Sequence, residues 1–272
     1  MVDISVLMSI YKNDHPLEVK DAIQSILNQT YQPEQIVIVL DGEVPNELLK
    51  VVETFAADSR FKVIPLKKNV GLGKALNTGI QYCNCEYVAR MDADDFSVPD
   101  RFEKQAAYLS EHPEVDVLGG QIEEYDEKMK NKIAVRSVPT EMSDIISRCK
   151  KRNPMNHVTV VYKKESVLRA GNYQTCMYFE DYYLWSRMIK MGFSFHNLPD
   201  VIVHVRTGKT MYQRRGGRAY NKSVIEFQNK MYELGIINRI EWLENLVIRL
   251  GVANMPNVMR GYIYQHKLRT NS

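Results

Sequence analysis

The sequence predicts an α/β fold with a mostly parallel, Rossmann-like central sheet and helices on both of its faces. Through the first hundred residues, short apolar runs alternate with amphipathic segments, which gives the order β-α-β-α-β-α-β. The apolar runs are nearly continuous, as in strands that are covered on both faces. A chain of 272 residues with an ordinary composition is also long enough to bury a sizeable core.

The elements of the first half are expected to follow one another closely. Pro16 is suited to open the first helix, because its fixed φ and missing N–H cost nothing there. Asp41-Gly42 is a turn signal that stops the second strand. The expected strands are residues 3–10, 36–40, 61–66 and 87–91, and the helices begin at Pro16, near Leu48 and within 71–79.

The second half is expected to combine helices with a hairpin. The expected elements are a helix from Pro99 to about His112, a hairpin of 115–125 and 131–138, a helix near 143–151, a strand entered through 153–161, a helix over 179–189, a strand at 201–205, and helices at about 219–234 and 239–250. We therefore expect a domain of residues 1–205 followed by a helical extension, 206–272.

The charge of the chain is divided unevenly. Residues 201–272 carry 12 Lys and Arg against 4 Glu, whereas the first 200 residues carry 24 basic against 29 acidic side chains. A basic extension predicts an anionic partner, either a phospholipid surface or nucleic acid. No apolar run approaches the ~18 residues of a membrane span, and we expect no signal peptide. Four cysteines without C-x-x-C or zinc spacing indicate reduced thiols in a cytoplasm.

Three carboxylates follow the fourth expected strand, at Asp92, Asp94 and Asp95. Ligands of open α/β sheets bind beyond the carboxyl ends of the strands. Hard oxygen ligands at that edge suit Mg²⁺ or Mn²⁺ shared with the phosphates of a substrate. The alternative is an Asx-rich turn that caps the next helix.

Other residues at the same edge are candidates for nucleotide contacts. Asp41 could accept a hydrogen bond from a uracil N3–H or a ribose hydroxyl, or belong to a plain Asp-Gly turn. Gly71-Leu-Gly73 could offer backbone N–H groups to phosphate, although it matches neither the dinucleotide-binding motif nor the P-loop. Lys74 could contact a pyrophosphate or a base, or be an exposed helix lysine.

Glu180 and Asp181 form a second acidic pair at the start of an expected helix. One of them could act as a general base if it faces the cleft. The alternative is a favourable pair of charges in the first turn of the helix. For His157, metal ligation competes with core packing, and packing is the commoner role of a lone histidine.

A loop after the last expected strand is rich in cations. Arg206, Arg214 and Arg215 lie there with Lys209. Guanidinium groups on such a loop suit the clamping of a pyrophosphate. Simple solvated charge is the alternative.

Taken together, these motifs resemble a family 2 glycosyltransferase of the GT-A fold, of the bacterial type that builds capsule or O-antigen polysaccharides. They occur in family order over about residues 3–190, and each is weak alone. The matching segments are Ser5–Tyr11, Ser25–Thr30, Val39–Gly42, Asn69–Asn77, Arg90–Asp95, Pro99–Phe102 and Glu180–Trp185.

The resemblance implies a role for each candidate residue. The half formed by 1–98 would bind the nucleotide through Ser9, Tyr11, Asp41, Lys74 and Asp92. Asp92 and Asp94 would form the D-x-D element that binds Mn²⁺ or Mg²⁺, with Asp95 as an alternative ligand. In the acceptor-binding half, 99–205, Asp181 would be the catalytic base beside Glu180, and His157 would contact the substrate or its diphosphate.

The resemblance further implies an inverting transfer of a hexose or N-acetylhexosamine from a nucleotide-sugar, most simply a UDP-sugar, to a lipid-diphosphate-linked saccharide. The basic extension would then lie at the inner face of the membrane through an apolar series, or the same series would pack on the domain or on a second subunit. The series is Val224, Phe227, Met231, Leu234, Ile236, Ile237, Ile240, Trp242, Leu243, Leu246, Val247 and Leu250.

Three other functions compete with this expectation. A sugar-1-phosphate nucleotidyltransferase needs a glycine-rich basic loop after the first strand, where this chain has Ser9-Ile-Tyr-Lys-Asn13. A nucleic-acid-binding protein leaves the clustered carboxylates unexplained, so we expect no nucleic acid. A non-catalytic membrane-associated scaffold is the third.

Overall fold

The computed structural model describes residues 2–208, 216–256 and 259. Over these residues, one sheet holds nine strands in the order β3-β2-β1-β4-β8-β6-β9-β5, with β7 paired to β6. The strands are β1 (Ile4–Ile10), β2 (Gln35–Leu40), β3 (Phe61–Pro65), β4 (Tyr87–Met91), β5 (Phe96–Ser97), β6 (Val117–Tyr125), β7 (Lys132–Arg136), β8 (Val161–Lys163) and β9 (Phe195–Arg206).

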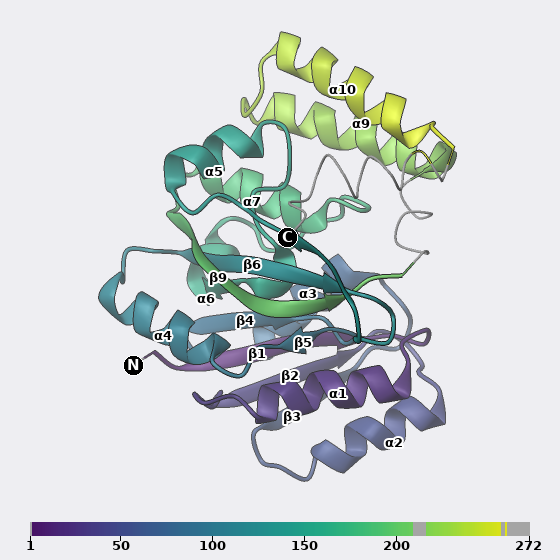
Figure 1. The fold of residues 1–272 in the computed structure, drawn as a ribbon, viewed down its shortest axis with the longest axis vertical. Coiled ribbons are helices and arrows are strands. Elements are labelled where there is room, and N and C mark those ends of the chain that lie inside the picture. Colours follow the sequence, from purple (N-terminus) through teal and green to yellow (C-terminus); the bar gives the residue numbers. More distant parts are fainter. Residues whose placement is uncertain (1, 209–215, 257–258, 260–272) are drawn as a thin grey trace.

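Helices flank the sheet on both faces, as the alternating sequence pattern predicted (Figure 1). They are α1 (Pro16–Leu27), α2 (Asn46–Phe55), α3 (Leu72–Gly79), α4 (Arg101–Glu111), α5 (Met142–Cys149), α6 (Lys164–Arg169), α7 (Glu180–Lys190), α9 (Gly217–Glu233) and α10 (Arg239–Ala253), with short 3₁₀ turns at Ile80–Tyr82 and His157–Thr159.

The first half of the sheet is parallel. Strands β3, β2, β1 and β4 run in one direction, with Ser9 opposite Val39 and Met8 opposite Met91. The chain therefore leaves β1, β2 and β4 at one edge of the sheet. This register places the segments that begin at Tyr11, Asp41 and Asp92 side by side, as expected for a ligand-binding edge.

The second half of the sheet is mixed. Strand β8 is antiparallel to both β4 and β6, whereas β9 is parallel to β6 and antiparallel to β5. Strand β9 begins at Phe195, six residues before the expected start, because it continues beside β6 through Asn197. The two-residue β5 and the short α6 were not expected, since neither is long enough to show a periodic pattern.

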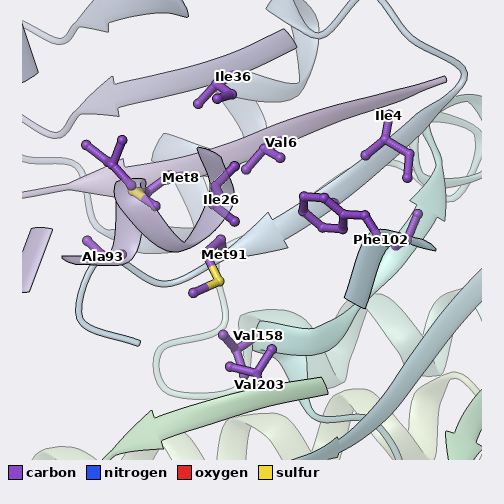
Figure 2. Packing of buried hydrophobic residues seen from close by; sticks show 14 of the residues in the cluster. Ile4, Val6, Met8, Ile26, Ile36, Met91, Ala93, Phe102, Val158 and Val203 are labelled. Carbon is purple, nitrogen blue, oxygen red and sulfur yellow. The ribbon is translucent and has the colours of Figure 1, made fainter. Parts of the chain in front are cut away.

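Two apolar cores lie on the two faces of the sheet. One joins β1 to α1, α2 and α4, and the other joins the opposite face to α3, α5, α6 and α7. Figure 2 shows the first of these, where Met8 lies near Ile26 of α1 and Ile4 lies near Phe102 of α4. Both faces of β1 and β2 are buried in this way, which explains their nearly continuous apolar sequences.

The expected helical extension is present as α9 and α10, at one end of the molecule beyond α5 and α7 (Figure 1). A third core holds it there, in which the rings of Phe179 and Phe227 stack with centroids 4.6 Å apart. Asn238 and Glu241 form a capping box at the start of α10. Among the described helices, none combines the length and the apolar character needed to cross a bilayer.

Candidate active site

Three aspartates gather where β4 ends. Carboxylate oxygens of Asp92, Asp94 and Asp95 all lie within 4.8 Å of one another. Asp92 accepts a hydrogen bond from Nη2 of Arg90, and Asp95 accepts one of 2.9 Å from the backbone N–H of Arg206. The acids lie in a turn, as the alternative interpretation expected, but strand β5 separates them from α4 and Asp100 is the N-cap residue of that helix.

This cluster carries an excess of negative charge. Partial loss of solvent and the neighbouring Asp92 carboxylate raise the pKa of Asp94 to about 6. Burial, together with the charges of Asp94 and Asp92, raises the pKa of Asp95 well above its usual range. Oxygen ligands that repel one another in this way suit a divalent cation, which would relieve the repulsion.

Asp14 is a further carboxylate close to the aspartate cluster, and the sequence analysis did not identify it. It lies in the loop after β1, where its carboxylate accepts a hydrogen bond of 2.8 Å from the backbone N–H of Tyr11. Burial and the charges of Asp94 and Asp92 raise its pKa to about 7. The only signal in the sequence was its position just beyond a strand that ends at the binding edge.

Arg90 is the buried counter-charge of the site. Its side chain is 2% exposed, and among the described residues its Nε and Nη1 have no hydrogen-bond partner. Its positive charge favours the ionised forms of Asp95 and Asp181, and so tends to lower their pKa values. Sequence reasoning missed this residue because it lies within an otherwise apolar strand, β4.

Asp41 braces the loop before α3. Its carboxylate accepts hydrogen bonds from the backbone N–H groups of Val70 and Gly71, at 2.7 and 3.0 Å, and from Nδ2 of Asn69 at 3.1 Å. Three of about four acceptor positions are thereby used. Gly42 is required beside it, because a Cβ there would lie 2.4 Å from the backbone N of Asn69. The contacts explain the Asp-Gly pair structurally, and a nucleotide contact by Asp41 stays a prediction.

The second acidic pair approaches the start of α3. A Cβ on Gly73 would lie 2.7 Å from Cγ of Glu180, so this glycine permits the close contact between α3 and α7. Burial and the adjacent Asp181 raise the pKa of Glu180 to about 7. Burial also raises the pKa of Asp181, which accepts a hydrogen bond of 2.6 Å from Nδ2 of Asn153. Asn153 is a further site residue without a signal in the sequence.

His157 has the contacts of a packed histidine. Its Nε2 lies 2.9 Å from the hydroxyl of Tyr173, and its ring meets the edge of Trp185. Burial and the charge of Arg90 lower its pKa well below the usual range, so the imidazole is neutral. The one group of possible metal ligands among the described residues contains only aspartates. These contacts favour the packing role that competed with metal ligation.

Lys74 and Arg206 lie in different surroundings. Lys74 is exposed on α3 and lines a shallow cavity of about 420 Å³ with Lys67 and Lys68. Nε of Arg206 donates to the carbonyl of Asp94 at 3.1 Å and lies 3.5 Å from a Glu18 carboxylate oxygen. Arg206 thus borders the acidic cluster.

The other candidates are two residues near the end of β1 and two arginines. Ser9, at the end of β1, and Tyr11, just beyond it, lie at the binding edge. Arg214 and Arg215 lie outside the described residues.

A sheet whose parallel half ends in a carboxylate cluster, joined to a mixed half, is the arrangement expected of the GT-A fold. The chain belongs to glycosyltransferase family 2, whose family model, described as "Glycosyl transferase family 2", matches residues 5–175. The resemblance seen in the sequence is therefore confirmed.

Relatives match almost the whole chain. It is 38% identical to the amylovoran biosynthesis glycosyltransferase AmsE of Erwinia amylovora, over 96% of this chain and 97% of that protein. It is 35% identical to a UDP-Gal:α-D-GlcNAc-diphosphoundecaprenol β-1,3-galactosyltransferase of Escherichia coli, over 97% of this chain and 96% of that protein. Both relatives agree with the expected bacterial polysaccharide type.

A solved structure supports the fold. The S. aureus protein TarS (residues 1–349), in complex with UDP-GlcNAc, superposes with a TM-score of 0.66 at 17% identity, over 91% of this chain and 71% of that chain. The GT-A fold class with a helical C-terminal region is thereby confirmed.

Proposed function

We propose that this glycosyltransferase transfers a hexose or N-acetylhexosamine, with inversion, from a UDP-sugar to a hydroxyl of a lipid-diphosphate-linked saccharide. The observation that supports the proposal is that the buried charge of Arg90 acts on two acidic groups that are far apart in the sequence. Arg90 is bonded to Asp92 and acts electrostatically on both Asp95 and Asp181. Asp92, which would bind the donor, and Asp181, which would act as the base, can therefore take part in the same reaction.

The donor would lie at the carboxyl ends of β1, β2 and β4. Ser9, Tyr11, Asp41 and Lys74 would contact the nucleoside along this edge. Asp92 and Asp94 would hold Mn²⁺ or Mg²⁺, because their oxygens are close together and Asp94 is exposed. A divalent ion bound there supplies a positive charge for the departing diphosphate.

The chemical step would use Asp181 as the general base. Its carboxylate accepts the proton of the acceptor hydroxyl while that oxygen forms a bond to the anomeric carbon. The bond from the anomeric carbon to the diphosphate oxygen breaks on the opposite side, so an α-linked donor gives a β-linked product. Asn153 donates a hydrogen bond that orients the Asp181 carboxylate. The raised pKa of Asp181 makes this carboxylate a stronger base.

The acceptor is inferred from chemistry and from the relatives. A relative that covers nearly the full length is named for an acceptor carried on diphosphoundecaprenol. A basic extension suits an anionic membrane surface, so we place the reaction at the inner face of the cytoplasmic membrane. His157 and Arg206 are proposed to line the diphosphate side of the cleft.

The proposal is tested by incubating the full chain with Mn²⁺, a panel of nucleotide-sugars and a saccharide diphosphate that bears a short alkyl chain. We expect transfer from a UDP-sugar, and NMR of the product should show a β-linkage. A product with retained anomeric configuration would contradict the single displacement. Hydrolysis of no donor at all would favour the non-catalytic scaffold.

A further inference from the structure

We infer that the outer face of α10, together with the basic end of α5, is the surface by which this protein lies on an anionic phospholipid bilayer. The outer face of α10 is defined as Ile240, Leu243, Val247 and Ile248. The inference rests on the proposed function, because a lipid-linked acceptor brings the enzyme to a membrane. The inference specifies which surface of the protein contacts the membrane, and that the contacted lipids are anionic.

The two faces of α10 have different partners. Trp242, Leu246 and Leu250 pack against the core that α9 shares with α7. On the other side, Ile240 is 72% exposed, Leu243 58%, Val247 65% and Ile248 64%. Single exposed apolar residues are ordinary on protein surfaces, but several on one helix face mark an interaction site.

The sequence alone left open whether the apolar series of the extension packs inside the protein or contacts a membrane. Of the apolar series predicted in the extension, Val224, Phe227, Met231 and Ile237 are buried, so they belong to packing. Only Ile240, Leu243 and Val247 of that series are strongly exposed, and Ile248 joins them. The exposed part forms a stripe along one helix, as in helices that lie in a membrane interface.

Basic residues border this stripe. Nζ of Lys150 lies 3.0 Å from Glu241, the amide of Asn245 donates to the carbonyl of Lys150 at 2.8 Å, and Arg249 donates to the carbonyl of Lys151 at 2.7 Å. The end of α5 is thus fixed along one side of α10. Of the charged residues here, Lys151, Arg152 and Arg239 are exposed and Lys150 is half-buried. Glu244 is an exposed acid on α10.

The charge of this surface favours an anionic bilayer as its binding partner. An anionic bilayer complements exposed basic residues that lie along one side of an apolar stripe. A second copy of the same face would instead bring two positive surfaces together around a modest apolar contact. Like charges across an interface oppose association. We therefore commit to the bilayer.

The surface also adjoins the proposed reaction centre. Asn153, which bonds the carboxylate of Asp181 at 2.6 Å, comes two residues after Lys151. A bilayer that contacts Lys151 therefore lies close to the acceptor side of the cleft. An acceptor anchored in that bilayer would present its saccharide to Asp181 without leaving the membrane.

The experiment is flotation of the full chain with vesicles of phosphatidylcholine alone or with 30% phosphatidylglycerol. We expect binding to the anionic vesicles and weak binding to the neutral ones. The double variant Leu243→Gln/Val247→Gln should reduce binding at least ~10-fold, and Lys150→Gln/Lys151→Gln should reduce it on anionic vesicles. The matched control is Leu17→Gln on α1, which is 65% exposed and should bind like the unaltered protein.

Two readouts separate this inference from the proposed function. With a short-chain acceptor in solution, Leu243→Gln/Val247→Gln should keep its turnover, whereas KM for a long-chain acceptor in vesicles should rise about 10-fold. Equal flotation of this variant and the unaltered chain overturns the inference even if transfer occurs. A dimer in solution that the same variant dissociates would also overturn it, because the face would then belong to a second copy.

Discussion

Arg90 is the side chain on which the electrostatics of the site depend. It is almost completely buried and bonded to Asp92, and its charge acts on Asp95, Asp181 and His157. A buried cation with two unpaired nitrogens is costly unless carboxylates surround it. Asp92 therefore compensates this buried charge directly, and the other acids of the candidate site lie within its field.

Asp181 and Glu180 differ in their surroundings, which gives the first prediction. Asp181→Asn should lower turnover at least ~10²-fold with donor binding largely kept, because general-base catalysis is worth 10²–10⁴. Glu180→Gln, the matched control, should lower turnover less than ~10-fold. The measurements are kcat and the Kd of UDP. If Glu180→Gln proves the more damaging change, the base is Glu180, whose pKa of about 7 also suits that role.

Asp14 gives a prediction about pH. Its pKa is raised to about 7 in the fold, so the native state binds more protons than the unfolded chain between about pH 4 and pH 7. The free energy of unfolding therefore falls as the pH rises through this window. Asp14→Asn should stabilise the protein at pH 8 by on the order of 1–2 kcal/mol, with a smaller effect at pH 5.

This effect is measured by urea unfolding in EDTA at the two pH values. Asn can still accept the hydrogen bond from the backbone N–H of Tyr11, so the loop geometry is kept. The exposed Asp21→Asn on α1 is the control and should not change the pH dependence. Equal stability of Asp14→Asn and the unaltered protein at pH 8 would show that this carboxylate is not repelled by the cluster.

Among the elements, α3 and α7 form the contact that positions the second acidic pair. Gly73 near the start of α3 leaves room for Glu180 near the start of α7. Sequence patterns place a glycine and two acids at helix starts. Only the packing of these two helices shows that the glycine sets the position of the acids.

Gly73→Ala should therefore lower activity more than stability. Its Cβ would lie 2.7 Å from Cγ of Glu180, so Glu180 must shift and carry Asp181 with it. We expect at least a ~10-fold loss of kcat, since small displacements of catalytic groups are costly. Gly251→Ala on α10 is the control, because a Cβ there meets nothing within 4 Å. It should stabilise by about 0.5–1 kcal/mol and leave kcat unchanged, and equal kcat in both variants would refute the positioning role.

At the scale of the whole molecule, two half-sheets of different construction meet at β4. The parallel half supplies the edge beyond β1, β2 and β4, and the mixed half brings β9 and α7 to the same place. Arg206 at the end of β9 bonds Asp95 beyond β4, so the two halves are joined at the acidic cluster itself. Ligand binding there should stabilise the entire domain.

UDP and Mn²⁺ together should consequently raise Tm by more than the sum of their separate effects. A ligand at one hundred times its Kd adds about 2.7 kcal/mol to stability, which corresponds to several degrees for a chain of this size. Asp94→Asn should remove the contribution of Mn²⁺ and retain part of that of UDP. Differential scanning fluorimetry measures this, and an equal UDP effect in EDTA would argue against a metal-bound diphosphate.

Some features of the structure could be predicted from the sequence, and others could not. The parallel strands, most helices and the gathering of Asp92, Asp94 and Asp95 were predicted, because each depends on a local pattern and on the rule that parallel strands end at one edge. Asp14, Arg90 and Asn153 were missed, because their roles come from neighbours distant in the sequence. Asp41 was expected directly after the second strand, where it lies, but its partners in the 69–71 loop depend on tertiary contact.

The sequence by itself determined an α/β fold with acids beyond the strand ends, because periodicity and motif order are properties of a linear chain. Tertiary structure alone decided which apolar residues of the extension are buried and which remain on the outer face of α10. It also decided that the buried charge of Arg90 acts on both acidic groups. Burial and charge compensation depend on distances through space, which no local pattern of residues specifies.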